Sequence, residues 1–181
     1  MMRRMRFPVL IIPFLFLFVA AAAMAAEPAA APAAAPAAQA PPPKPLGVGD
    51  KIAKLGLTDL DGKNVEVALD KGLVAISFFN SSCSACKAEM RLLDAMAKQN
   101  KALKVVAVSV DAQGDKTTRP FIEANKFDKF AFYIDPEYKV PEKFGFSYSP
   151  ALIVVKDGSI TLKHAGFMNQ DEEMLGKHLL K

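Results

Sequence analysis

Cysteine and histidine are scarce in this chain, and tryptophan is absent from its 181 residues. The two cysteines are Cys83 and Cys86, and the two histidines are His164 and His178. A structural zinc site usually takes four such ligands, but the histidines lie far from the cysteines in sequence, on a predicted strand and a predicted last helix. The scarcity argues against a zinc site, and both histidines are predicted to be solvated side chains and not catalysts.

A strong excess of charge is also missing once the N-terminus is set aside. The formal net charge is +4 and the sequence pI is about 9.0, but Arg3, Arg4 and Arg6 account for three of the 23 basic residues. The remainder has 20 basic and 19 acidic residues. Such a balanced surface has no field that would attract nucleic acid or an acidic partner, so no nucleic-acid partner is predicted.

Residues 1–26 have the pattern of an export signal. Arginines precede an apolar run at residues 9–19, and residues 23–25 supply small side chains at an A-x-A spacing. Residues 7–26 carry no charge, and about 20 apolar residues can span a bilayer, so an uncleaved membrane anchor stays open as the alternative. Both interpretations export the rest of the chain, which predicts a periplasmic domain, either soluble or tethered to the inner membrane.

Residues 27–45 form a segment rich in proline and alanine. This segment has no large apolar side chain, so it cannot form a packed core. Its proline density favours an extended, semi-rigid linker. The folded domain is therefore predicted to occupy residues 46–181.

Alternating strand and helix patterns in residues 46–181 predict an α/β sandwich. The apolar runs at 72–79 and 103–110 are typical of strands buried on both faces, and residues 84–99 have helical periodicity. Hairpins are predicted at 57–69 and 151–165. A further strand is predicted at 131–134 and a short helix at 136–144. A helix is predicted at 119–126, with Pro120 in its first turn. The last helix is predicted to start after Asn169 as its N-cap and to end at Leu180.

The stretch FFNSSCSACKAEM, residues 78–90, places Cys83 where a buried strand passes into a helix. Free amide groups and the helix dipole stabilise a thiolate at such a position. Cys86, one turn further on, can close a small disulfide ring with Cys83. Three uses stay open: a redox-active dithiol, which suits an exported chain; a structural disulfide, whose short loop adds little stability; and a two-sulfur Cu(I) site in a copper-binding or delivery module.

When residues are placed around the axis of the predicted helix at 84–99 at about 100° per residue, Glu89 is the only charged residue in the apolar arc. Cys86 lies next to Glu89 in this projection. A half-buried carboxyl has a raised pKa and can transfer a proton near neutral pH. Glu89 is therefore predicted to accept the proton of Cys86. The alternative is that Glu89 reaches solvent at the start of the helix, where acidic side chains are favoured.

Residues 48–168 resemble the TlpA/ResA-like periplasmic thiol–disulfide oxidoreductases of the thioredoxin superfamily. The resemblance lies in the buried strand before FFNSSCSACKAEM, in ALIVV preceded by Pro150, in the hairpin at 156–158 and in Gly166. It implies a thioredoxin-like three-layer sandwich with a central mixed sheet and an N-terminal β-hairpin extension.

The same resemblance implies the roles of individual residues. Cys83 would be the exposed nucleophile and Cys86 the buried resolving thiol, joined as a redox-active disulfide in the oxidised form. Glu89 matches the acidic residue found in ResA-like proteins. Ser149 and a cis Pro150 would face the disulfide and bind substrate.

Five residues depart from related patterns. Ser82 stands where the family usually has tryptophan, and it is grouped with the substrate-binding residues. Ser84-Ala85 matches neither the Gly-Pro of thioredoxin nor the Pro-His of DsbA. Ser77 occupies the place of the buried aspartate of thioredoxin, which leaves Glu89 as the expected acid. Peroxiredoxins carry threonine where this chain has Asn80, so peroxidase activity is not expected.

The resemblance thus implies an enzyme that reduces disulfides of envelope proteins, for example apocytochromes c. Its electrons would come from a membrane thiol relay, and it would need no cofactor and no metal. A disulfide-forming oxidant and the copper module remain the alternatives.

Overall fold

Strand β3 (Leu73–Phe79), which leads to the cysteine pair, is an inner strand of the sheet, and its seven residues are all buried. The structure is a computed structural model that describes residues 44–127, 129–168 and 170–180. The predicted export signal and most of the predicted linker lie outside these ranges. The elements in chain order are β1 (Lys54–Thr58), β2 (Asn64–Ala68), β3 (Leu73–Phe79), α1 (Ser84–Gln99), β4 (Leu103–Ser109), α2 (Asp115–Asn125), β5 (Phe130–Ile134), α3 (Lys139–Lys143), β6 (Ala151–Lys156), β7 (Ser159–Ala165) and α4 (Asp171–Leu179).

The strands of the described residues form one mixed sheet in the order β2-β1-β5-β4-β3-β6-β7. β3, β4 and β5 are parallel, whereas β6 and β7 run antiparallel to them as a hairpin. The β1–β2 hairpin joins β5 through one antiparallel pair, Thr58 with Ile134. This arrangement confirms the predicted α/β class, the mixed sheet and the N-terminal hairpin extension.

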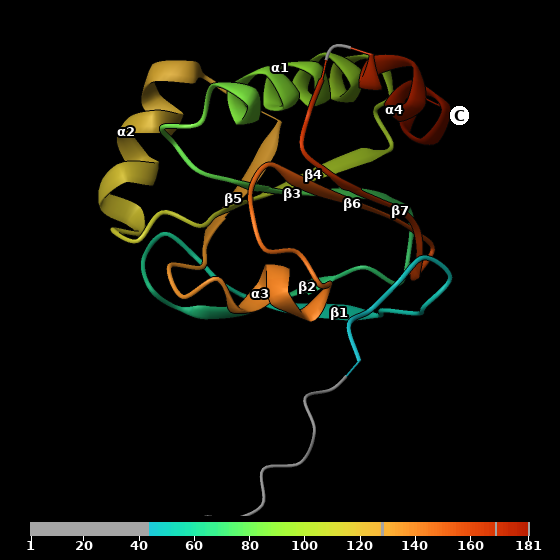
Figure 1. Cartoon of the computed structure of the whole chain (residues 1–181), viewed down its shortest axis with the longest axis horizontal. Helices are drawn as coiled ribbons and strands as arrows, with labels where there is room; N and C mark the ends of the chain where they lie inside the picture. Colours follow the sequence, from blue (N-terminus) through green and yellow to red (C-terminus); the bar gives the residue numbers. More distant parts are fainter. Residues whose placement is uncertain (1–43, 128, 169, 181) are drawn as a thin grey trace, which may run out of the picture. The chain divides into compact units, whose positions relative to one another are not determined.

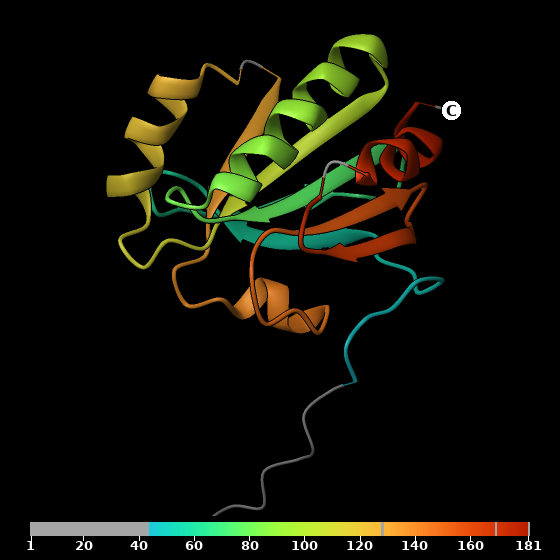
Figure 2. The same ribbon diagram turned by 45° about the horizontal axis from the view of Figure 1, so that its top comes forward.

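Helices cover both faces of the sheet, as Figures 1 and 2 show. α1, α2 and α4 lie on one face, where the apolar side of α1 packs on alternate residues of β3 and β4. α3 lies on the other face, where side chains of β1 join the same core cluster. On this face Phe78 packs between Phe144 and Phe146 at ring-centroid distances of 6.1 and 6.2 Å. Full burial of each such ring contributes roughly 1.5–3 kcal/mol. Because β3 is covered on both sides, it is a continuous apolar run and not an alternating one.

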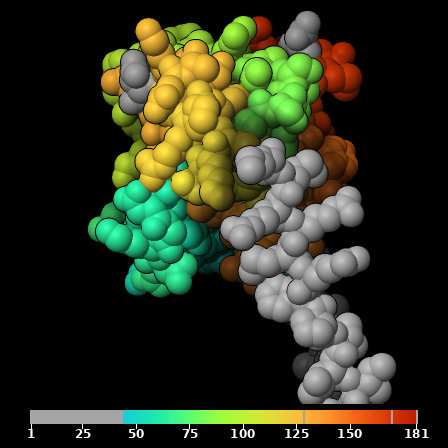
Figure 3. Space-filling model, turned by 90° about the vertical axis from the view of Figure 1, so that its left-hand side faces the viewer, coloured from blue at the N-terminus to red at the C-terminus, as the bar shows by residue number. Residues whose placement is uncertain are grey.

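The helix α2 begins earlier than predicted. It starts at Asp115, so Pro120 lies inside the helix and not in its first turn. The exposed proline leaves one carbonyl of the preceding turn without its usual amide donor, while the Thr118 hydroxyl bonds back to the Gly114 carbonyl at 2.8 Å. Arg119 ties α2 to the hairpin by donating to the Leu60 carbonyl at 2.7 Å, and Figure 3 shows both elements on one face.

The last helix also differs in detail from the prediction. α4 starts at Asp171 after Gln170, which makes no side-chain capping bond, and the predicted cap Asn169 lies outside the described residues. The Asp171 carboxylate instead accepts the amide N–H of Met168 at 2.7 Å. Among the helices that the structure describes, none has the length and apolarity needed to cross a membrane.

Candidate active site

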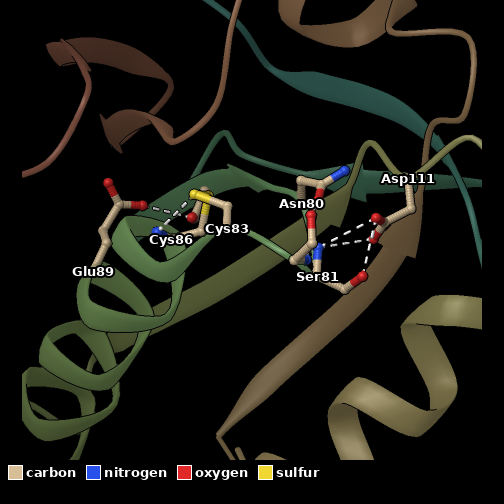
Figure 4. Close-up of a disulfide and its surroundings, with 8 residues drawn as sticks. Asn80, Ser81, Cys83, Cys86, Glu89 and Asp111 are labelled. Carbon is tan, nitrogen blue, oxygen red and sulfur yellow. Dashed lines mark hydrogen bonds between the residues drawn. A yellow bond between two sulfur atoms is a disulfide. The ribbon is translucent and has the colours of Figure 1, made fainter.

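Cys83 lies at the junction of β3 and α1, as the sequence predicts. It is the N-cap residue of α1 in an extended conformation, and its sulfur accepts the backbone N–H of Cys86 at 3.0 Å. A disulfide joins the two cysteines (Figure 4). Cys83 is partly exposed whereas Cys86 is fully buried. The N–H that points at the Cys83 sulfur is the donor that stabilises a thiolate once the disulfide is reduced.

The loop before Cys83 is held by side-chain hydrogen bonds. Asn80 accepts the amide of Ser82 at 3.0 Å and its hydroxyl at 2.5 Å. Asp111 accepts both the amide and the hydroxyl of Ser81 at 3.0 Å (Figure 4). It also accepts the hydroxyl of Ser109 at 2.7 Å. Asp111 is buried, with 6% of its surface exposed. These bonds fix the chain segment that delivers Cys83 to the helix start.

Sequence reasoning missed Asp111. A usable signal was present, because this acid lies two residues after the end of the buried strand β4, and the ends of neighbouring parallel strands meet at one edge of a sheet. The register pairs Phe79, the last residue of β3, with Ser109, the last of β4. Asp111 therefore lies beside the loop that begins at Asn80.

Glu89 is buried beneath the site and does not reach solvent, so the alternative of an exposed carboxylate is wrong. Its exposed fraction is 0%, and its Oε1 accepts the hydroxyl of Ser77 from β3 at 2.7 Å. Its Oε2 has no partner among the described atoms. Burial raises the pKa of Glu89 to about 7, the Ser77 hydrogen bond opposes the rise, and the negative charge of Asp171 adds to it. Glu89 can therefore exchange a proton near neutral pH.

Ser149 and Pro150 lie at the same end of the sheet. Their peptide bond is cis, and Pro150 is buried while Ser149 is partly exposed. β6 starts at Ala151, which pairs with Phe78 near the end of β3. The amide of Gly166 donates to the Pro150 carbonyl at 2.8 Å, so the loop after β7 is joined to the loop before β6.

Two exposed apolar side chains flank these loops. Tyr148 is 56% exposed and Met168 is 61% exposed. They lie two residues before Pro150 and two residues after Gly166. Ser82, directly before Cys83 in the chain, is exposed and polar. Sequence reasoning did not identify Tyr148 and Met168 as exposed apolar side chains next to these loops.

The two histidines are less exposed than the sequence predicts. His164 is not a solvated side chain, because its side chain is 22% exposed and its Nε2 lies 3.1 Å from Oδ2 of Asp171. His178 is partly buried on α4. Within the described ranges, no three His, Cys, Asp or Glu side chains are grouped as a metal site would need.

The fold and the cysteine pair together define a thioredoxin-like thiol–disulfide oxidoreductase. The sequence profile of the AhpC/TSA family matches residues 48–163, and the chain belongs to this family. Its similarity to ResA proteins confirms the resemblance to TlpA/ResA-like members of the thioredoxin superfamily. ResA thiol–disulfide oxidoreductases from Bacillus thuringiensis subsp. konkukian and Bacillus anthracis are 27% and 28% identical to it over 138 residues, which are 74% of this chain and 78% of theirs.

Solved structures agree with this assignment. A protein from Chlorobium tepidum assigned as the thiol:disulfide interchange protein DsbE superposes with a TM-score of 0.67 at 26% identity, over 75% of this chain and 96% of that one. The thioredoxin domain of a thiol–disulfide oxidoreductase from Bacteroides vulgatus superposes with a TM-score of 0.60 at 20% identity, over 74% and 99% of the two chains. The similarity to the Bacteroides vulgatus domain supports the fold alone, because the identity is only 20%.

Proposed function

We propose that this protein is an exported reductase that transfers two electrons from its dithiol to disulfides of envelope proteins, with apocytochromes c as the expected kind of substrate. The observation that carries the proposal is the placement of a partly exposed Cys83 at a helix start, above a buried Cys86 and a buried Glu89. An accessible sulfur can attack a substrate, and a protected one beside a proton acceptor can complete the exchange.

The reaction proceeds in two exchanges. The Cys83 thiolate attacks one sulfur of the substrate disulfide, so that a mixed disulfide forms and the other substrate sulfur leaves as a thiolate. Glu89 then accepts the proton of Cys86, and the Cys86 thiolate attacks the sulfur of Cys83. The second substrate sulfur leaves, the substrate has gained two electrons, and the enzyme holds the Cys83–Cys86 disulfide.

Substrate binding is assigned to the loops around the disulfide. Ser149, Pro150 and Ser82 would contact the chain that carries the substrate cysteine, and Tyr148 and Met168 would add apolar contacts. A peptide that docks on these loops would meet the exposed edge of Cys83. The exposed fractions of Tyr148 and Met168 support this assignment, since large exposed apolar side chains commonly mark contact surfaces.

The location and the electron supply belong to the same proposal. Residues 1–26 would direct export, as a cleaved signal or as an anchor through residues 7–26, and residues 27–45 would separate the domain from the membrane. A reductase in an oxidising compartment needs a source of electrons. A membrane thiol relay is the expected donor, and a dithiol of the Cys-x-x-Cys type is its natural acceptor.

Peroxidase activity is not part of the proposal, although the family profile covers most of the domain. Asn80 stands where peroxiredoxins carry threonine. Its side-chain oxygen accepts two hydrogen bonds from Ser82. It therefore holds the loop and offers no hydroxyl to a peroxide.

The midpoint potential of the Cys83–Cys86 couple tests the direction of electron flow. We expect a value nearer to that of thioredoxin, about −270 mV, than to that of DsbA, about −120 mV, together with reduction of insulin disulfides. A potential near the DsbA value would replace the reductase by an oxidant. Anaerobic titration with Cu(I) is the companion measurement, because tight one-to-one binding with negligible insulin reduction would favour a copper module.

A further inference from the structure

A second buried acidic side chain lies on the same face of the sheet as Glu89. Asp171, the first residue of α4, is 8% exposed. Its Oδ2 lies 3.1 Å from Nε2 of His164 and accepts the amide N–H of Met168 at 2.7 Å. The carboxylate is therefore held from two sides, by a strand β7 side chain and by the backbone before its own helix.

The strand register relates this cluster to the active site. Ser77 on β3 pairs with Leu152 on β6, and Leu152 pairs with His164 on β7. The three residues form one row across the sheet, so their side chains project toward the same layer. Two strand spacings of about 4.8 Å place the ends of the row on the order of 10 Å apart. Ser77 holds Glu89, and His164 holds Asp171, at the two ends of this row.

The residue between Ser77 and His164 in this row is apolar. Leu152 is fully buried, and it belongs to one core cluster with Leu93 of α1 and Leu175 of α4. Charges separated by such packing interact through a lower effective dielectric constant than charges in water, and salt screens them less. A negative charge on Asp171 therefore acts on Glu89 through this packing, and it adds to the rise in the pKa of Glu89.

Resting on the proposed role of Glu89 as proton acceptor, we propose that Asp171 is a positioning residue for the proton step. Its buried charge makes the Glu89 carboxylate a stronger base, so that Glu89 accepts the proton of Cys86 more readily. His164 and the Met168 amide fix Asp171 in place. The groups that face Glu89 are Ser77 from β3, the disulfide of its own helix and Asp171 from α4. The Asp171 carboxylate faces His164, while its neighbours Glu172 and Glu173 are exposed.

The variant Asp171→Asn tests this proposal, because asparagine keeps an acceptor for the Met168 amide and removes the charge. The protonation of Glu89 would be followed by carbon-13 NMR of its carboxyl group in the oxidised protein, with Glu172→Gln as the matched control that removes an exposed charge from the same helix. We expect Asp171→Asn to lower the midpoint of Glu89 by on the order of one pH unit, when the length of the strand row, about 10 Å, is taken as the separation of the charges and the effective dielectric constant is about 20. An unchanged midpoint would overturn the proposal.

A reciprocal measurement covers the case in which Asp171→Asn does not fold. Interacting groups report each other's titration, so the Asp171 carboxyl signal of the unaltered protein should show an inflection at the midpoint of Glu89. Glu89→Gln should abolish this inflection, and its persistence would contradict the coupling. Both measurements use the oxidised protein without substrate, so they can succeed or fail independently of insulin reduction and of the proposed function.

Discussion

The hydroxyl of Ser77 donates a hydrogen bond to Oε1 of Glu89 across 2.7 Å, beneath the disulfide. This bond joins the strand that leads into the active site to the helix that leaves it. The Ser77 hydroxyl is a neutral donor, so it favours the ionised form of the Glu89 carboxyl without supplying a charge. Burial outweighs it, and the pKa of Glu89 is raised to about 7. The balance between the two effects places the proton exchange of Glu89 near neutral pH.

Removal of the Glu89 carboxyl should change how stability depends on pH. In the unfolded chain Glu89 ionises near its ordinary pKa of 4.5, but in the oxidised folded protein it keeps its proton to a pKa of about 7. The folded state therefore binds more protons between these values, and the unfolding free energy falls as pH rises through this window and is constant above it. Relative to Glu89→Gln, the unaltered protein should lose about 3 kcal/mol between pH 4.5 and 7.

Urea unfolding of the oxidised protein at a series of pH values measures this difference. Glu172→Gln is the control, because it removes an exposed acid from α4. Parallel stability profiles for the unaltered protein and Glu89→Gln would show that Glu89 does not have a raised pKa in the fold.

Ser77→Ala should move the midpoint of Glu89 upward. The Ser77 hydrogen bond lowers the pKa of Glu89, whereas burial raises it, so the loss of the hydroxyl leaves the effect of burial unopposed. Carbon-13 NMR of the Glu89 carboxyl measures the midpoint, and Ser84→Ala, at an exposed position at the start of α1, is the control. A midpoint that stays near 7 would mean that the hydrogen bond does not influence the proton.

The sequence predicted the parts of the site that depend on local pattern. The continuous apolar run of β3, the helix start at Cys83 and the position of Glu89 within the apolar arc all follow from residues close together in the chain. The sequence did not predict the role of Asp111 or the pair of His164 with Asp171. The positions of these residues depend on the order of the strands in the sheet and on how α4 packs against it. No local periodicity reports that β4 ends beside the loop of Asn80, or that α4 places its first residue over β7.

Substitution of Asp111 should loosen the loop before Cys83. Asp111→Ala leaves the amide and hydroxyl of Ser81 and the hydroxyl of Ser109 without their acceptor. Such a loss of buried partners costs roughly 2–4 kcal/mol of unfolding free energy. Denaturant unfolding measures the loss, and Asp70→Asn at an exposed position is the control. A loss below about 0.5 kcal/mol, as for an ordinary surface substitution, would show that Asp111 does not brace the loop.

Glu89→Gln should also change the pH profile of disulfide reduction. With glutamine at this position Cys86 loses its proton acceptor, so the rise in rate centred near pH 7 should disappear and the rate near neutral pH should fall by about 10²-fold or more, since a positioned acid–base group contributes about 10²–10⁴. Stopped-flow reduction of a disulfide substrate at several pH values checks this. An identical profile for the two proteins would remove Glu89 from the mechanism, although it could still affect stability.

The reactivity of Cys83 is the prediction on which the proposed chemistry depends most directly. Its sulfur is the N-cap of α1 and accepts the Cys86 amide at 3.0 Å, so the same amide should stabilise the thiolate in the reduced protein. In Cys86→Ser, which keeps this backbone amide and isolates one thiol, the rate of alkylation by iodoacetamide should reach half its maximum well below pH 8.5, the approximate value for free cysteine. A short peptide with the same local sequence is the control, because it has the neighbouring residues without the folded helix start. If the two midpoints coincide, the helix start does not activate Cys83, and a structural disulfide or a copper-binding pair would explain the two cysteines better than catalysis.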